Sequence, residues 1–349
     1  MNQKKPFSKD ILLLDNVEAV VDNICKKMQE DVQVILQRKG CVVGMSGGID
    51  SSVCTALATR AFGPDKVVGI MIPEKDSSSD SEELAMILSK KLGIQAIKEI
   101  ITPALEGYHC YERRDKAVRK VFPEYDPSTH KMKIGIRQSG LFTSLPPIFT
   151  VTIVDNEGKQ KEQLLPADEY LQIVAASNLK QRTRMSILYF HAEARHYVVV
   201  GTPNRQEQDQ GFFVKYGDGG ADIMPISNLY KTQVYQIAKY LGVPQAIIER
   251  TPTTDTYSAY QTQEEFFYQL PVEQMDLYWF GFENDYSPAE VARVMGETPE
   301  RVEALFANFK RKRRTTDYLR LAPIRDYYGP TAYEDNNLIT SSSELATSN

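Results

Sequence analysis

One short stretch of the sequence combines glycines, hydroxyls and a carboxylate at a spacing that suits phosphate chemistry. It follows an apolar run, precedes a helix-like segment, and consists of Gly44, Met45, Ser46, Gly47, Gly48, Ile49, Asp50, Ser51 and Ser52. Adjacent glycines let the backbone turn tightly and approach a ligand closely. Hydroxyls and N–H groups at the start of a helix bind anions, helped by the helix dipole. The stretch therefore predicts a site for a chain of phosphates.

The acidic side chain in this turn distinguishes it from the lysine-containing Walker loop. The GxxxxGK[ST] spacing and its lysine are absent, and Asp50 occupies the turn instead. A carboxylate beside a polyphosphate suits Mg²⁺, which bridges one or two carboxylates to phosphate oxygens and keeps several waters. The alternative is a structural turn in which Asp50 only caps the helix. Because so many elements coincide, we favour the phosphate site.

The segments around this turn alternate between strand and helix patterns. Apolar residues recur at three- and four-residue steps over 17–39, which indicates an amphipathic helix that Gly40 ends. The pattern continues with predicted strands at 41–45, 66–72 and 95–101 and predicted helices at 51–62 and 82–92. Strands that alternate with helices of about ten residues predict a parallel α/β sheet covered on both faces.

The alternation breaks after residue 102. Alternating residues 150–154 and a turn at 156–158 predict a β-hairpin in this part, and we interpret 103–167 as an insertion. The pattern then resumes with a helix at 178–195, a strand at 197–200, a helix at 229–241, and a helical region at 264–313 with Ser287 and Thr298 as N-caps. We expect one domain over 1–332 and a disordered, Ser/Thr-rich tail over 333–349.

The composition excludes several classes of protein. Of 349 residues, 41 are Lys or Arg and 46 are Asp or Glu, so the net charge of −5 supplies no general attraction for nucleic acid. The four cysteines show neither CxxC nor paired His/Cys spacing, which argues against a zinc site or a disulfide framework. The chain lacks a secretory pattern, and no run approaches the roughly 18 apolar residues of a membrane span. We therefore expect a cytoplasmic protein without membrane contact.

Several blocks of the sequence resemble known families. The stretch 44–52 is similar to the SGGxDSS signature of the ATP pyrophosphatase (PP-loop) superfamily, whose members cleave ATP between its α and β phosphates. Further blocks resemble ammonia-dependent NAD synthase, and they lie at 178–185, 201–207, 211–222, 229–234 and 252–255. The resemblance implies a Rossmann-like doubly wound parallel sheet of the adenine nucleotide alpha hydrolase (PP-loop) type, with an inserted segment and a helical C-terminal region.

The resemblance also implies an activity and a set of site residues. The family amidates deamido-NAD with ammonia, through an acyl-adenylate, and releases AMP and pyrophosphate. By matching motifs, residues 44–51, Thr202, Lys231 and Thr253 would bind ATP, whereas Asp50 and Glu207 would bind Mg²⁺. The residues implied to bind deamido-NAD are Arg182, Lys215, Asp222, Lys310 and Arg311, and the residues implied to act in catalysis are Asp50, Lys215 and Lys231. A homodimer is implied too, and free ammonia is the expected nitrogen source because the chain contains no glutaminase domain.

Two departures from the family pattern leave the acid substrate open. The family carries a His-Lys pair near its C-terminal end, where this chain has 308–314 without a histidine, and the insertion at 103–167 is absent from the compact pattern. One alternative is therefore a related amide ligase that adenylates a different carboxylic acid. A tRNA-modifying PP-loop protein that uses the basic run 310–314 is a second alternative, although a CxxC pair is missing. A catalytically silent nucleotide-binding protein is the third.

Overall fold

The computed structural model describes residues 4–137, 147–253 and 256–324. The predicted disordered tail lies outside these ranges, as do Thr254 and Asp255 of the block at 252–255. Along the described chain, no helix combines the length and apolar character needed to cross a membrane.

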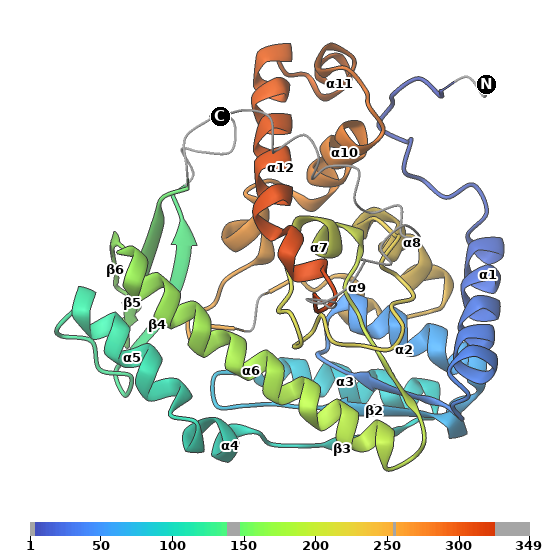
Figure 1. Cartoon of the computed structure of the whole chain (residues 1–349), viewed down its shortest axis with the longest axis horizontal. Helices are drawn as coiled ribbons and strands as arrows, with labels where there is room; N and C mark the ends of the chain where they lie inside the picture. Colours follow the sequence, from blue (N-terminus) through green and yellow to red (C-terminus); the bar gives the residue numbers. More distant parts are fainter. Residues whose placement is uncertain (1–3, 138–146, 254–255, 325–349) are drawn as a thin grey trace, which may run out of the picture.

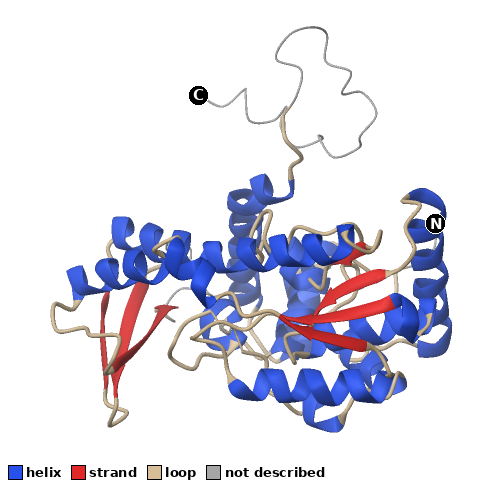
Figure 2. Ribbon diagram, turned by 90° about the horizontal axis from the view of Figure 1, so that it is seen from below, coloured by secondary structure: helices blue, strands red, loops and turns tan. Residues whose placement is uncertain are grey.

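A parallel sheet forms the centre of the molecule. Its strand order is β3-β2-β1-β7, and its strands are β1 (Cys41–Gly44), β2 (Val67–Met71), β3 (Gln95–Lys98) and β7 (Val198–Val200). In register, Cys41 lies beside Val67 on one side and Val198 on the other. The strands β1, β2 and β7 are almost wholly buried, because helices cover both faces of the sheet (Figures 1 and 2). The predicted parallel α/β architecture is confirmed.

Successive residues of each strand pack against different helices. Val43 and Val67 belong to the core formed with helices α1 (Val17–Gln29), α2 (Ile49–Phe62), α3 (Ser79–Leu92) and α8 (Lys231–Tyr240). Val42 and Val68 face the opposite way, toward the long helix α6 (Ala167–Glu193). This alternation follows from the two-residue period of a strand.

The segment after residue 102 builds a second body. Helices α4 (Thr102–Gly107) and α5 (Cys110–Val121) precede an antiparallel sheet of β4 (His130–Ile136), β5 (Phe149–Asp155) and β6 (Gln160–Leu164), with β5 in the middle. The hairpin predicted around 156–158 is confirmed, and Gly158 supplies the positive φ of 82° in its turn. Val118, Met132 and Val151 bury the inner face of this sheet, hereafter the inserted sheet.

The C-terminal part is helical, as predicted. The helices are α10 (Val272–Glu283), α11 (Pro288–Met295) and α12 (Pro299–Arg320), and they pack around Trp279, Leu305 and Phe309. Both predicted N-caps are confirmed: Ser287 accepts from the N–H of Glu290, and Thr298 accepts from the N–H of Arg301. Shorter helical segments are η2 (Pro64–Lys66), α7 (Arg205–Gln210), α9 (Gln245–Ile248) and η4 (Glu264–Tyr268).

Two helices differ from their predicted bounds. The helix predicted over 17–39 leaves α geometry at Gln29, continues as the wider turn η1 (Glu30–Ile35), and stops before Gln37, whose φ is +52°. The helix predicted from residue 178 begins at residue 167 instead. Its first turns contact both the inserted sheet and the cavity described below, so their apolar residues do not form a single stripe.

Candidate active site

A cavity of about 760 Å³ opens where the strands of the parallel sheet end. Gly44 at the end of β1, Met71 at the end of β2 and Val200 at the end of β7 lie in its wall. Ligands of open α/β sheets bind at this edge, outside the carboxyl ends of the strands. The predicted phosphate loop at 44–51 contributes to the same wall.

The backbone of the loop requires a glycine at one position. Gly47 has a φ of +71°, and a Cβ placed on it would lie 2.5 Å from the carbonyl oxygen of Ser81. Hydroxyls brace the rest of the turn, because the Ser46 and Ser51 Oγ atoms lie 3.0 Å apart and the N–H of Gly48 donates to Ser46 Oγ at 3.3 Å. No side chain among the described residues caps α2 at its N-cap, Gly48. The first N–H groups of this 14-residue helix are therefore available to an anion.

A buried charged centre lies directly behind the loop. Asp50, in the first turn of α2, forms an ion pair with Lys231, the first residue of α8, and accepts from Asn204 Nδ2 at 3.3 Å. The Lys231 side chain is only 3% exposed. Burial alone would lower the pKa of Lys231, but the carboxylates of Asp50 and Glu207 outweigh it and raise that pKa above its ordinary value. Lys231 is therefore a fixed cation at the loop.

Glu207 is the second carboxylate of this centre. It forms a capping box with Asn204 at the start of α7, where its own side chain accepts from the Asn204 N–H at 3.1 Å. Burial, followed by the charge of Asp50, raises the pKa of Glu207 to about 8. A cation that binds between Glu207 and Asp50 would therefore stabilise the ionised form of Glu207.

The pair of acids fits Mg²⁺ on the chemistry of its donors. In the part of the chain that the structure describes, no group of three or more His, Cys, Asp and Glu side chains forms a complete metal cage. Mg²⁺ does not need one, since it commonly takes one or two carboxylates and completes its octahedron with water and substrate phosphates. Asp50 and Glu207 are the residues that would hold it.

Other residues implied to bind ATP also lie in the wall of the cavity. Thr202 follows β7, and Thr253 pairs with Thr262 in an isolated antiparallel bridge. Sequence analysis missed Arg250, which donates to the carbonyl of Gly47 at 3.4 Å and to Ser81 Oγ at 3.0 Å. Arg250 thus ties the loop to α3 from about 200 positions away, a contact that no local pattern signals.

Four residues implied to bind the acid substrate lie outside the described lining of the cavity. Arg182 donates to the backbone carbonyl of Lys215 at 3.2 Å, and Lys215 Nζ donates to the carbonyls of Tyr318 and Leu321 at 2.8 and 2.7 Å. Asp222 accepts from the N–H of Val199 at 2.7 Å beside β7. The fourth residue, Lys310, is exposed on α12. Their predicted substrate contacts stay predictions.

Neighbouring side chains occupy the wall instead. Gln181 and Arg184 on α6 line the cavity beside Arg182, and Arg311 and Lys312 line it beside Lys310. Lys312 Nζ lies 3.1 Å from the centre of the Phe267 ring and donates to Gln210 at 3.1 Å. Burial lowers the pKa of Lys312 well below its ordinary value. The run at 308–314 therefore brings two basic side chains to the cavity, one of them Arg311 as predicted.

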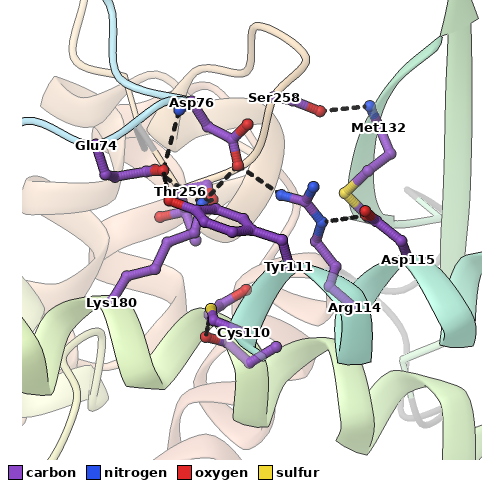
Figure 3. A network of polar contacts seen from close by, with 12 residues as sticks. Glu74, Asp76, Cys110, Tyr111, Arg114, Asp115, Met132, Lys180, Thr256 and Ser258 are labelled. Atoms are coloured by element: carbon purple, nitrogen blue, oxygen red, sulfur yellow. Dashed lines mark hydrogen bonds and ion pairs between the residues drawn. The ribbon is translucent and has the colours of Figure 1, made fainter. Parts of the chain in front are cut away.

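A second charged cluster holds the wall of the cavity in place, and sequence analysis did not single it out. Lys180 Nζ on α6 donates to Glu74 and Asp76 at 2.8 Å each and to the carbonyl of Thr256 at 3.0 Å. Arg114 on α5 joins Asp76 to Asp115 in the same buried network (Figure 3). The acids follow β2, next to the cavity residues Pro73 and Ser77. The network fastens this loop to α5 and α6.

Comparison with known proteins identifies the family. The NAD synthase family model matches residues 20–134 and 148–316. The chain belongs to the NAD synthase family. Within the family, it is 48% identical over 314 residues to the NH3-dependent NAD+ synthetase of Mesorhizobium japonicum, covering 90% of this chain and 98% of that one. It is 44% identical to the synthetase of the same name from Rhizobium meliloti, covering 91% and 94%.

Solved structures support the NAD synthase fold. NMN synthetase from Francisella tularensis has a TM-score of 0.59 at 20% identity and covers 90% of this chain and 99% of its own. NH3-dependent NAD synthetase from Campylobacter jejuni gives the same TM-score and identity, covering 89% and 99%. The predicted fold class of this NAD synthase family member is therefore confirmed. The family match leaves residues 135–147 unmatched between its two parts. It does not test the insertion bounds of 103–167 or the single domain over 1–332, which stay predictions.

Proposed function

We propose that the protein amidates deamido-NAD with ammonia at the expense of ATP, releasing AMP and pyrophosphate. The observation that carries this proposal is the assembly of the glycine loop, Asp50, Glu207 and Lys231 in one cavity of a NAD synthase family member. The full-length likeness to relatives named NH3-dependent NAD+ synthetase indicates the same acid and the same nitrogen source.

The reaction has two steps, and the chain's residues mainly position and neutralise charge. In the first step, an oxygen of the nicotinate carboxylate bonds to the α phosphorus, and the bond from that phosphorus to the bridging oxygen breaks, so pyrophosphate leaves with the electron pair. The N–H groups of the loop and the start of α2 would hold the phosphates, and Lys231 would offset their charge. Aligning two anions in this way removes most of the barrier that bringing them together in water would impose.

In the second step, ammonia attacks the acyl carbon, AMP leaves, and a proton is lost to give the amide. Mg²⁺, held by Asp50 and Glu207, would supply further neutralisation of the leaving pyrophosphate when bound. Free ammonia is the nitrogen source we propose, in keeping with the names of the curated relatives. We also propose a homodimer, which sedimentation at micromolar concentration tests.

Product analysis tests the proposed function. The protein is incubated with ATP, Mg²⁺ and ammonium together with deamido-NAD, nicotinate mononucleotide or an unrelated aromatic acid. We expect one AMP and one NAD per deamido-NAD consumed, and we expect Asp50→Asn to lose at least about a hundredfold in rate because a phosphate-side charge is gone. AMP release that is robust only with another acid would instead establish a related amide ligase. Absence of AMP with every acid would reject the ligase chemistry.

A further inference from the structure

Another buried carboxylate joins the two helices that carry Glu207 and Lys231. Asp276 lies on α10 and is 0% exposed. Its Oδ2 accepts from the N–H of Thr232 at 2.7 Å and from Thr232 Oγ1 at 2.8 Å, and its Oδ1 accepts from Gln206 Nε2 at 3.1 Å. Thr232 follows Lys231 on α8, and Gln206 precedes Glu207 on α7. Each of these two donors is therefore adjacent in sequence to a charged residue of the phosphate site.

The start of α8 receives its carboxylate from a different helix. The first N–H groups of a helix have no partner within it. Tyr230, at the N-cap, directs its hydroxyl to Glu283 at 3.0 Å, away from these N–H groups. Asp276 accepts there instead, and its negative charge offsets the positive end of the helix dipole. This offset matters because Lys231, the first residue of α8, adds a full positive charge at the same end.

A chain of buried amides reaches Asp276 from the wall of the cavity. Lys312 Nζ donates to Gln210, and Gln210 Nε2 donates to Gln206 Oε1. Gln206 and Gln210 are each 1% exposed. Because an ammonium only donates and a carboxylate only accepts, the two ends of the chain fix the direction of both amides. Burial raises the pKa of Asp276, but its N–H and amide donors oppose that rise and favour the charged form.

Asp276 and Asp50 hold the same two helix starts. Asp50 pairs with Lys231 at the start of α8 and accepts from Asn204 at the N-cap of α7. Asp276 reaches these starts from the C-terminal helices, where α10 contacts α8 and α12 contacts α7 (Figure 1). The two carboxylates therefore determine together how far apart the side chains of Lys231 and Glu207 lie.

We propose that Asp276 is a positioning residue, which holds Lys231 and Glu207 at the spacing that ATP and Mg²⁺ require. This inference rests on the proposed function for the roles of those two residues. In the proposed reaction, Asp50 would exchange its partners for a metal ion, whereas Asp276 touches no reacting atom and keeps its donors. A misplacement of about 1 Å that originates far from the chemistry can cost a hundredfold in rate. A carboxylate behind the site can therefore govern the rate.

Asp276→Asn tests this bridge, because it keeps the size of the side chain and replaces one acceptor with a donor. The amide oxygen can serve Thr232 or Gln206 but not both, so one helix start is released. Hydrogen exchange in the ligand-free protein should therefore become faster at 205–210 or at 231–234. We expect kcat for deamido-NAD amidation to fall at least about tenfold, while the KM for deamido-NAD changes less than about twofold.

Binding of an unreactive nucleotide separates the effect on the site from turnover. The probe is an ATP analogue with a methylene bridge between its α and β phosphates, added with Mg²⁺ and measured by calorimetry. We expect its affinity for Asp276→Asn to be about tenfold lower than for the wild type, because the charges that meet the phosphates are displaced.

A polarity swap between Asp276 and Gln206 should restore the bridge. When Gln206→Glu is combined with Asp276→Asn, the introduced carboxylate accepts from the introduced amide and from Gln210. Gln206→Glu alone places two carboxylates face to face and should also lower kcat. We expect the double variant to regain at least about threefold in kcat over either single variant, since residues in one network are coupled.

Val302→Ala is the matched control, because Val302 is 0% exposed in the core around Trp279 and its side chain cannot form a hydrogen bond. It should lower stability and leave kcat and the analogue affinity unchanged. Thr232→Val removes only the hydroxyl donor to Asp276 and should lower kcat about threefold. It carries the test if Asp276→Asn fails to fold.

Three results would overturn the proposal. They are unchanged kcat and analogue affinity in Asp276→Asn, equal losses in Val302→Ala, and a polarity swap that regains nothing. A wild-type protein that binds the analogue but does not amidate deamido-NAD contradicts the proposed function instead. The analogue affinities of the variants then still test the bridge.

Discussion

Glu207 shows how the surroundings of one buried acid can favour the binding of a cation. The residue is only 9% exposed, and its neighbours include Asp50, a second acid. Ionising it in the ligand-free protein is therefore unfavourable, which the pKa of about 8 expresses. A cation that binds both acids stabilises the ionised form of Glu207. Part of the binding free energy of that cation therefore comes from offsetting the repulsion between the two acids.

The raised pKa of Glu207 predicts a pH dependence of stability. An unfolded Glu ionises near 4.5, whereas the folded one holds its proton to about 8. The stability that this shift contributes is present in full below 4.5 and is lost as pH rises through 8. The free energy of unfolding of the wild type, relative to Glu207→Gln, should fall by up to roughly 1.4 kcal/mol per pH unit in this window.

Urea unfolding at pH 5, 6.5 and 8 without nucleotide or metal measures this dependence. Glu162→Gln, on the exposed strand β6, is the control and should track the wild type. Parallel curves for the wild type and Glu207→Gln would contradict the proposed electrostatics.

The loop glycine gives a second prediction at the residue scale. Gly47→Ala would place a methyl group 2.5 Å from the Ser81 carbonyl at a positive φ, so the loop must move. We expect a loss of at least about tenfold in ATP affinity, measured by calorimetry. Gly93→Ala is matched in φ, at +69°, but its Cβ would meet open space among the described residues. It should lower stability by about 1 kcal/mol and leave ATP binding intact. Equal ATP affinity in both variants would reject the steric argument.

At the scale of elements, the network around Lys180 joins parts of the chain that are distant in sequence. Burial alone would raise the pKa of Asp76, but Lys180 and Arg114 outweigh it and lower that pKa. The ammonium of Lys180 also reaches the carbonyl of Thr256, which lies in another stretch of the cavity wall. Loops from two walls of the cavity therefore share one buried cation.

Removing that cation should be costly. Lys180→Met leaves the buried Glu74 without its cation and Asp76 with Arg114 alone, and such a loss costs about 3–5 kcal/mol. Thermal and urea unfolding measure it. Lys161→Met breaks an exposed pair with Glu124, 2.9 Å apart, and should cost less than about 1 kcal/mol. Similar losses in the two variants would show that the network does not hold the loops.

The elements themselves were largely predictable from local pattern. Short β-branched runs bounded by turns identified β1, β2 and β7, and the caps Ser287 and Thr298 act through neighbours three positions away. The end of α1 and the start of α6 were not predictable from local pattern, because tertiary contacts override local preference there.

The site was predictable in its phosphate half and less so elsewhere. The loop at 44–51 places its chemistry within eight consecutive positions, so its sequence carries its geometry. Arg250 and Lys180 act across the fold, and nothing in their local sequence distinguishes them from surface or core residues. Among the residues that the motifs imply for the acid substrate, Arg311 lines the cavity and Arg182 does not, and the roles of both stay predictions.

Along the described chain, the parallel sheet, the inserted sheet and the C-terminal helices each have a core, and α6 runs from the inserted sheet to the parallel sheet (Figure 1). The phosphate loop belongs to the parallel sheet, and Phe149 of the inserted sheet lines the same cavity. ATP bound at the loop should protect the loop from exchange and leave the inserted sheet unchanged. Hydrogen exchange can measure this difference because backbone protection reports local opening.

We expect an ATP analogue with a methylene bridge between its α and β phosphates, added with Mg²⁺, to slow exchange at 44–52 and 201–207. Asp50→Asn should weaken this protection, while Leu171→Ala, at an exposed position of α6, leaves it in place. If the analogue protects 149–155 and 256–266 instead, ATP binds at the inserted sheet and the loop at 44–51 is not its site.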